Sequence, residues 1–276
     1  MKMKIVLLTT LIGFVLNACG QEKVELVNKF NSETEYLVSS KFETKMKVTY
    51  DASEEFINYL KSKGTENTKV SEDISNMKIN YITGVEKNGI MPIEIIYLET
   101  GKPQDGFIRN GESLKGTYSL KDKIKINEIP RKNTSEMDDN QIMKLLGDGL
   151  SLDFFDNGKV QIGDSVKTNS PLNIPIGSYQ ISFNVLNTYI LKSIYSDKAH
   201  FDIHTVCELN SNLPQISLTA SGGGSGQCTL DIKNKKIVDK KTVLKLIMNM
   251  EIQKDIKLNL VQEIKSEEIT IIKNNR

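Results

Sequence analysis

The chain has 276 residues, of which 38% are hydrophobic and 26% are charged, a balance typical of proteins that bury a substantial core. Its 36 Lys and Arg residues nearly match its 35 Asp and Glu residues. This balance argues against a nucleic-acid partner held by phosphate electrostatics. Two His and three Cys residues are too few for a multi-metal or redox-cluster protein. One large or two small domains remain.

The N-terminus has the pattern of a secretory signal. Residues 1–4 are basic, and residues 5–16 form an apolar run that is shorter than the about 20 residues needed to span a bilayer. The run ends in Leu16-Asn17-Ala18-Cys19, which resembles the lipobox of bacterial lipoproteins. We therefore expect residues 1–18 to be a signal peptide and Cys19 to be lipidated. An ordinary secretory signal with a chance Cys, or a membrane anchor, are the alternatives.

Lipidation predicts where the protein lies. Two acyl chains give stable membrane anchoring, and Gly20 is not the Asp that lipoprotein sorting rules associate with the inner membrane. We therefore predict a lipid-anchored protein of the cell envelope, most simply at the outer membrane. Residues 19–34 would be the lipidated N-terminus and a tether, and residues 35–270 the folded domain.

Two further cysteines, Cys207 and Cys228, lie in the C-terminal third. An oxidising compartment favours closure of such a pair. Strand alternation places Cys207 on the same face as Ile203, and Cys228 on the same face as Leu230, so both thiols lie on apolar faces. We predict a Cys207–Cys228 disulfide, and two reduced, buried thiols are the alternative.

Long stretches of alternating side chains predict β-strands along most of the chain. Residues 36–50 alternate almost without a break, which predicts a strand about 50 Å long that twists and curls. The pattern returns at residues 77–85, and Asn88-Gly89 predicts a hairpin turn before the next strand at 90–99. A further pair of strands is expected around residues 116–129. The C-terminal third is expected to contain strands at 179–185, 200–207, 215–220, 228–232, 242–252 and 256–264.

Loops and helices are few. The glycine-rich segment 221–226 is expected to be a flexible hairpin loop, and Lys235-Lys236 a turn. Residues 54–61 can form a short helix with Ser53 as its N-cap, and residues 138–150 a longer one. The elements predict a mainly β fold in which long curled antiparallel strands form an open half-barrel or two related sheets, with one or two short helices. Two similar halves that meet near 131–170 are conceivable.

Several motifs together resemble a family of uncharacterised lipoproteins from double-membraned bacteria. They are the lipobox, the alternating strand Lys41–Val48, the segment Val160–Ser165, the glycine-rich stretch before Cys228 and a closing pair of long strands. The strand pattern also resembles the lipoprotein-carrier fold, an open curled sheet wrapped partly around helix. The resemblance implies the handling of lipids or lipoproteins.

Candidate chemical groups have simpler explanations. His200, Asp202 and His204 share one strand face and could contribute to a metal site, but a solvated face explains them better. The glycine-rich segment lacks the Lys and the helix start of a phosphate-binding loop. Neither a nucleophile motif nor a carboxylate pair can be identified. We therefore predict no catalytic residue, no metal site and no cofactor.

Methionines on the expected apolar faces suit an adaptable apolar pocket, although they also suit plain core filling. We predict a non-catalytic lipoprotein that binds a hydrophobic ligand, such as a lipid or an acyl chain, through Phe42, Met46, Leu246 and Met248. One alternative is a structural or interaction lipoprotein that docks an envelope protein partner and has no ligand cavity. Another is a hydrolase of envelope material. No nucleic-acid partner is expected.

Overall fold

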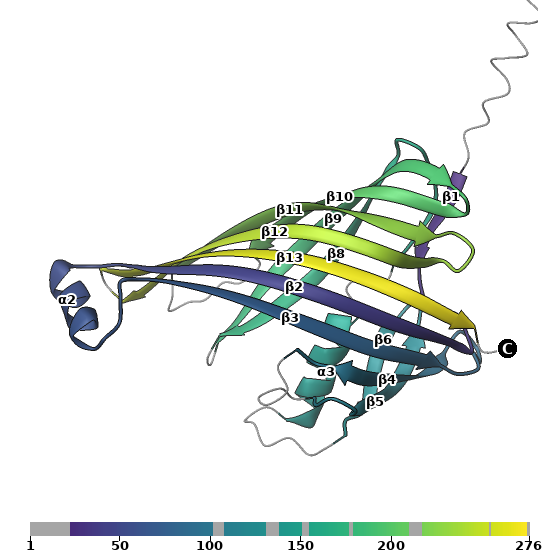
Figure 1. Ribbon diagram of the computed structural model, residues 1–276, viewed down its shortest axis with the longest axis horizontal. Helices are drawn as coiled ribbons and strands as arrows, with labels where there is room; N and C mark the ends of the chain where they lie inside the picture. Colours follow the sequence, from purple (N-terminus) through teal and green to yellow (C-terminus); the bar gives the residue numbers. More distant parts are fainter. Residues whose placement is uncertain are drawn as a thin grey trace, which may run out of the picture.

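The computed structural model describes residues 23–101, 108–130, 138–150, 155–176, 179–209, 217–253 and 255–274. Most of these residues are in strands (Figure 1), which confirms the mainly β prediction. Two helices lie within the described ranges, α2 (Glu54–Ser62) and α3 (Asp139–Leu150). Neither of them is long and apolar enough to cross a membrane.

The described residues form thirteen strands. In chain order they are β1 (Lys23–Asn28), β2 (Thr34–Asp51), β3 (Thr68–Thr83), β4 (Met91–Glu99), β5 (Ser113–Ser119), β6 (Lys123–Glu128), β7 (Phe155–Gln161), β8 (Ser165–Ile176), β9 (Tyr179–Tyr195), β10 (Lys198–Leu209), β11 (Ser217–Asp231), β12 (Lys236–Gln253) and β13 (Ile256–Asn274).

Eleven of the strands form one antiparallel sheet with the order β6-β5-β4-β3-β2-β13-β12-β11-β10-β9-β8. Each half of the chain is a meander, and the two meanders meet where β2 pairs with β13 from Thr34↔Asn274 to Asp51↔Lys257. The long strands therefore build a single sheet and not two related sheets. The sheet is twisted and open but not strongly curled (Figure 1), so the half-barrel prediction overstated its curvature.

A small second sheet pairs β1 with β7. Its first strand lies in the segment predicted to be a tether, but Leu26 and the following Phe30 are almost fully buried. The tether prediction was therefore too long, because the partner of β1 lies more than a hundred residues away in the sequence and cannot be inferred from local pattern.

Local signals account for several turns and helix starts. Asn88 and Gly89 both have positive φ angles, 54° and 78°, and they join β3 to β4 as the Asn-Gly signal predicts. The Ser53 hydroxyl accepts a hydrogen bond from the Phe56 amide at 3.3 Å at the start of α2, and Asp138 accepts one from the Gln141 amide at 2.8 Å at the start of α3. Both predicted helices are confirmed.

The glycine-rich segment 221–226 is not a loop but lies inside β11. A Cβ atom added at Gly224 would lie 2.2 Å from the Val243 carbonyl oxygen of β12, and one at Gly226 would lie 2.2 Å from the Lys241 oxygen. Glycine is required here because the backbone of β12 approaches β11 too closely for any side chain. The loop prediction was wrong for this reason.

The buried side chains lie in three clusters, and we call the face of the large sheet that carries them the core face. The first cluster surrounds Phe30, whose ring centroid lies 4.9 Å from that of Tyr36. The second lies between the small sheet and β9–β11, around Leu191 and Phe201. The third contains Phe183, Cys207, Leu246 and Met248.

Candidate functional site

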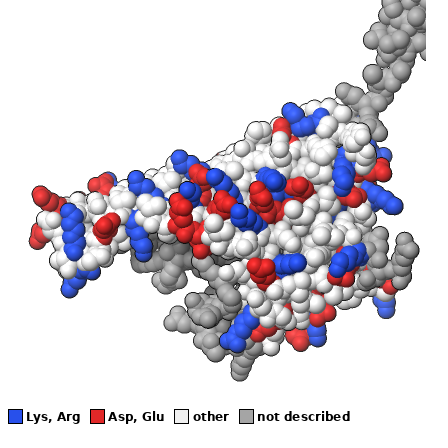
Figure 2. All heavy atoms as spheres, in the orientation of Figure 1, with Lys and Arg blue, Asp and Glu red and all other residues white. Residues whose placement is uncertain are grey.

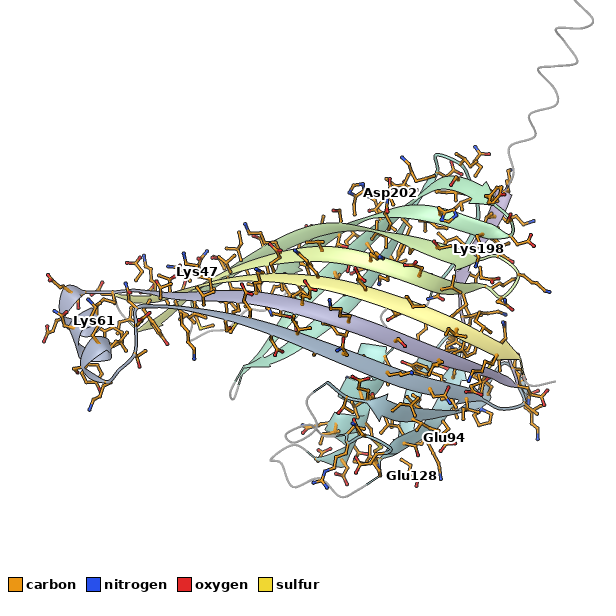
Figure 3. All side chains as sticks on the ribbon, viewed as in Figure 1. Lys47, Lys61, Glu94, Glu128, Lys198 and Asp202 are labelled. Carbon is orange, nitrogen blue, oxygen red and sulfur yellow. The ribbon has the colours of Figure 1, made fainter. Side chains whose placement is uncertain are left out.

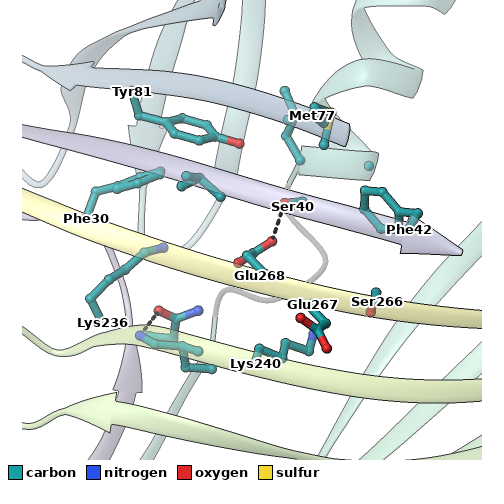
Figure 4. Close-up of a pocket in the computed structure, with 15 residues that line it drawn as sticks. Phe30, Ser40, Phe42, Met77, Tyr81, Lys236, Lys240, Ser266, Glu267 and Glu268 are labelled. Atoms are coloured by element: carbon teal, nitrogen blue, oxygen red, sulfur yellow. Dashed lines mark hydrogen bonds between the residues drawn. The ribbon is translucent and has the colours of Figure 1, made fainter. Parts of the chain in front are cut away.

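A cavity of about 270 Å³ opens on the core face between the first and second clusters (Figure 4). It is bounded by β2, β3, β13, the start of β12 and the end of α3. Fifteen residues line it: Asn28, Phe30, Val38, Ser40, Phe42, Met77, Tyr81, Gly149, Leu150, Lys236, Ile237, Lys240, Ser266, Glu267 and Glu268.

One wall of this cavity is apolar. Phe30 and Tyr81 come from the first cluster, where their ring centroids are 5.1 Å apart. Met77, Phe42 and Leu150 are only half-buried, so these side chains keep part of their apolar surface available. The wall can accept an apolar group without repacking of the core.

The other wall carries charges. Ser40, Glu268 and Lys240 lie side by side on β2, β13 and β12, because Ser40 pairs with Glu268 and Glu268 with Lys240. The Ser40 hydroxyl donates to Glu268 Oε2 at 3.3 Å. Lys236 is only 6% exposed, and its Nζ lies 4.4 Å from the centroid of the Phe30 ring.

The charges of this wall do not include the carboxylate of Glu267. Its Oε1 lies 3.6 Å from Nζ of Lys241, the neighbour of Lys240 on the opposite face of β12. Among the described lining residues, Lys236, Lys240 and Glu268 place charged side chains at this wall. The cavity thus has an apolar wall and a polar wall.

The structure places the four predicted ligand residues on the core face, but only Phe42 lines the cavity. Met46 is half-buried farther along β2, and the register joins it through Gln262 to Leu246 in one row across the sheet. Leu246 and Met248 are 2% and 6% exposed within the third cluster, so they fill the core.

Sequence reasoning missed Lys236, Lys240 and Glu268. Lys240 and Glu268 occupy positions that the strand alternation assigns to the apolar face, and a charged residue at such a position is the signal that could have found them. Lys236 offers no signal of this kind, because the sequence predicts a turn at Lys235-Lys236. In the structure it is the first residue of β12.

The predicted disulfide is not formed, and this prediction is corrected. Both cysteines are buried on the core face of adjacent strands, as the alternation predicted, but neither is in a disulfide. Cys207 pairs with Gly222, whereas Cys228 pairs with Phe201, so the two lie six positions apart. At about 3.3 Å per residue this offset is about 20 Å, far beyond the about 7 Å that a disulfide bridges.

The His200, Asp202 and His204 row lies on the opposite, outer face of β10, where Figure 3 shows Asp202 pointing away from the sheet. Asp202 accepts a hydrogen bond from Gln227 at 3.2 Å and lies 3.5 Å from Lys192 Nζ. Within the described ranges, no cluster of three or more His, Cys, Asp or Glu side chains is placed so that it could hold a metal ion.

The rest of the outer face carries charges of both signs over β2, β12 and β13 (Figure 2). They pair across strands, as in Lys45 and Glu72 at 2.9 Å. Exposed ion pairs of this kind contribute about 0–1 kcal/mol each. We interpret this face as the solvated side of the sheet.

The predicted lipidation site, Cys19, lies outside the described residues. Comparison with known proteins adds no relative: no protein-family model matches the chain, and no curated protein sequence matches it. The resemblance to envelope lipoproteins, the outer-membrane location and the absence of catalysis therefore stay predictions.

Proposed function

We propose that the protein is a non-catalytic, lipid-anchored envelope protein that binds a hydrophobic ligand, such as an acyl chain, in the core-face cavity. One observation carries the proposal: Phe42, Met77 and Leu150 form a half-buried apolar wall around free volume on the core face. Apolar surface left next to an opening favours an apolar occupant.

The shape of the face supports a chain-like ligand. Beyond Phe42 the core face continues along β2 to Met46 and, across the sheet, to the third cluster. Ligand pockets commonly measure about 300–1,000 Å³, so a cavity of about 270 Å³ suits one chain and not a lipid with several chains.

The test is native mass spectrometry of the full chain, with solvent extraction of any bound molecule and titration with hexadecanoic acid. We expect a stoichiometric adduct. The Phe42→Glu variant should weaken it about tenfold or more, because a charge would be buried against the chain. Glu43→Gln, on the opposite face of the same strand, is the matched control. A chain that takes up no fatty acid or fatty alcohol would contradict the proposal.

A second candidate function is docking of an envelope protein partner, and α2 favours it. This helix stands at the far tip of β2 and β3, whereas β1 lies at the opposite end of the molecule (Figure 1). It contains no buried residue, and Tyr59 is 56% exposed. An apolar helix side that the described part of the chain leaves accessible is typical of a docking surface.

A photo-crosslinking residue at position 59 tests this candidate in cells. We expect one discrete cross-linked product that the Phe56→Ser replacement diminishes, with Lys61→Gln on the same helix as the control (Figure 3 labels Lys61 at this tip). The absence of any product would remove the support for partner docking through α2.

A further inference from the structure

The outer face of the large sheet carries many charges, but one part of it is apolar. This part lies where β13, β2, β3 and β4 are neighbours, at the end of β2 opposite α2 (Figure 1). We call it the outer-face patch and define it by five residues: Leu37, Ile96, Leu98, Ile269 and Ile271. Ile269 and Ile271 are 54% and 52% exposed, and Leu98 is 44% exposed. Exposed apolar side chains that gather in this way are typical of an interaction surface.

We propose that the outer-face patch binds the same patch of a second copy of this chain, so that two sheets stack face to face in a symmetric dimer. The two-fold axis runs along the strands, between β2 and β3. The patch lies on the face opposite the cavity, so the inference is independent of the ligand and goes beyond the proposed function.

The first argument is the order of the apolar residues across the four strands. Ile271 of β13 pairs with Leu37 of β2. Leu37 pairs with Asn80 of β3, and Asn80 pairs with Ile96 of β4, so this row has an isoleucine at both ends. A two-fold axis between β2 and β3 exchanges β13 with β4. It therefore places Ile271 of one copy over Ile96 of the other, and it does so twice in each dimer.

The next row toward α2 repeats this arrangement. Ile269 pairs with Ser39, and Ser39 pairs with Lys78. Leu98 lies beside Lys78, where the register between β3 and β4 shifts. The same axis brings Ile269 of one copy over Leu98 of the other. Stacked sheets lie about 10 Å apart, and side chains from both inner faces fill this space, so apolar side chains meet in both rows.

The second argument is charge complementarity in the row on the other side of the patch. Lys273 of β13 and Glu94 of β4 lie at the two ends of this row. The axis places each Lys273 opposite the Glu94 of the second copy. Lys273 Nζ lies 3.1 Å from Glu35 of its own chain, but an ammonium group has three donors. It can therefore bind both carboxylates.

The alternative two-fold axis, which runs across the strands, fits less well. It would stack each strand on its own copy and place Lys273 over Ile269, so that a charge would be covered by an apolar side chain. Only the axis along the strands matches apolar with apolar residues and opposite charges with each other. This self-complementarity is why we assign the patch to a second copy and not to a different protein.

The experiment is sedimentation velocity of the full chain up to about 200 µM, well above the micromolar dissociation constant that we expect for a small interface. Ile271→Ser should weaken the dimer about tenfold or more, because one replacement removes two apolar contacts per dimer. Ile74→Ser is the matched control, since Ile74 is 63% exposed on the outer face of β3 but lies outside the patch.

Two charge reversals test the orientation. Lys273→Glu and Glu94→Lys should each weaken the dimer, because each creates two contacts between like charges across the axis. An equimolar mixture of the two variants should restore it, since a mixed dimer contains one native pair and one reversed pair, both attractive. Lys257→Glu, at the far end of the same face of β13, is the matched control. Thermal unfolding shows whether each variant is folded.

Three outcomes would overturn the inference. A chain that stays monomeric at every concentration would leave the patch to a different partner. A dimer that neither Ile271→Ser nor the charge reversals weaken would associate through another surface. Loss of the dimer in both charge variants without recovery in the mixture would exclude the two-fold axis along the strands.

Discussion

The close approach of β12 to β11 makes a sharp prediction about two adjacent glycines. Gly224 lies on the core face, and a Cβ atom added there would lie 2.2 Å from the Val243 carbonyl oxygen and 3.0 Å from the Leu244 Cα. Gly223 lies on the other face, where the nearest atom to an added Cβ is the Thr205 carbonyl oxygen at 3.4 Å. The Gly224→Ala and Gly223→Ala replacements therefore add the same atoms in opposite environments.

The expected magnitudes follow from these contacts. Overpacking costs about 1–3 kcal/mol, and the obstruction at Gly224 is backbone that cannot rotate away, so we expect about 3 kcal/mol of destabilisation. The contact at Gly223 is ordinary, and alanine restricts the unfolded chain more than glycine does. Gly223→Ala should therefore be neutral or stabilising by about 0.5 kcal/mol.

Urea unfolding of the full chain, followed by far-ultraviolet circular dichroism, measures both effects as changes in the free energy of unfolding. This probe suits a chain that contains no Trp. A loss of the same size in both variants, or no loss in Gly224→Ala, would refute the close approach and favour a flexible glycine-rich loop instead.

Three further predictions concern single side chains. Cys207 and Cys228 should both react with iodoacetamide after unfolding without reductant. In the native state, burial raises the pKa of the Cys207 thiol and should protect it from the reagent. A pair of thiols that stays unreactive after unfolding would support the disulfide instead. Cys19→Ser should abolish incorporation of labelled palmitate in cells, and label retained by the variant would contradict the lipobox. Burial raises the pKa of Tyr97 to about 12 from 10.0, so the unfolded chain releases this proton first, and stability should fall between pH 10 and 12. Two pKa units correspond to about 3 kcal/mol, and the Tyr97→Phe variant should lose this share of the pH dependence.

The parts of the fold that the sequence predicts are those set by local rules. Alternation in β2 predicts a one-sided strand, Asn88-Gly89 predicts the turn between β3 and β4, and Ser53 predicts the start of α2. Local rules gave the wrong prediction for the glycine-rich segment 221–226, because a glycine-rich composition favours loops. Here the close backbone of β12 requires glycine within β11. This requirement is set by tertiary packing and has no local signal.

The disulfide shows a second limit of sequence reasoning. The parity of a strand position decides which face a side chain occupies, and it was right for Cys207 and Cys228. The distance between two such positions depends on the register of β10 against β11, which is set by the turn and by the packing of the whole face. Register shifts by an even number of residues leave each side chain on its face, so a pair can share a face and still lie about 20 Å apart.

The position of the candidate site follows from what covers the core face. The helix α3 packs on β6, and the small sheet contacts the opposite flank of the large sheet. The row of Ser40, Glu268 and Lys240 lies between these two covers. A charged pair on a core face lowers stability unless it is compensated, whereas apolar residues at these positions would have let the two clusters close into one. The polar row therefore interrupts the apolar face between the two clusters, and the cavity lies at this interruption.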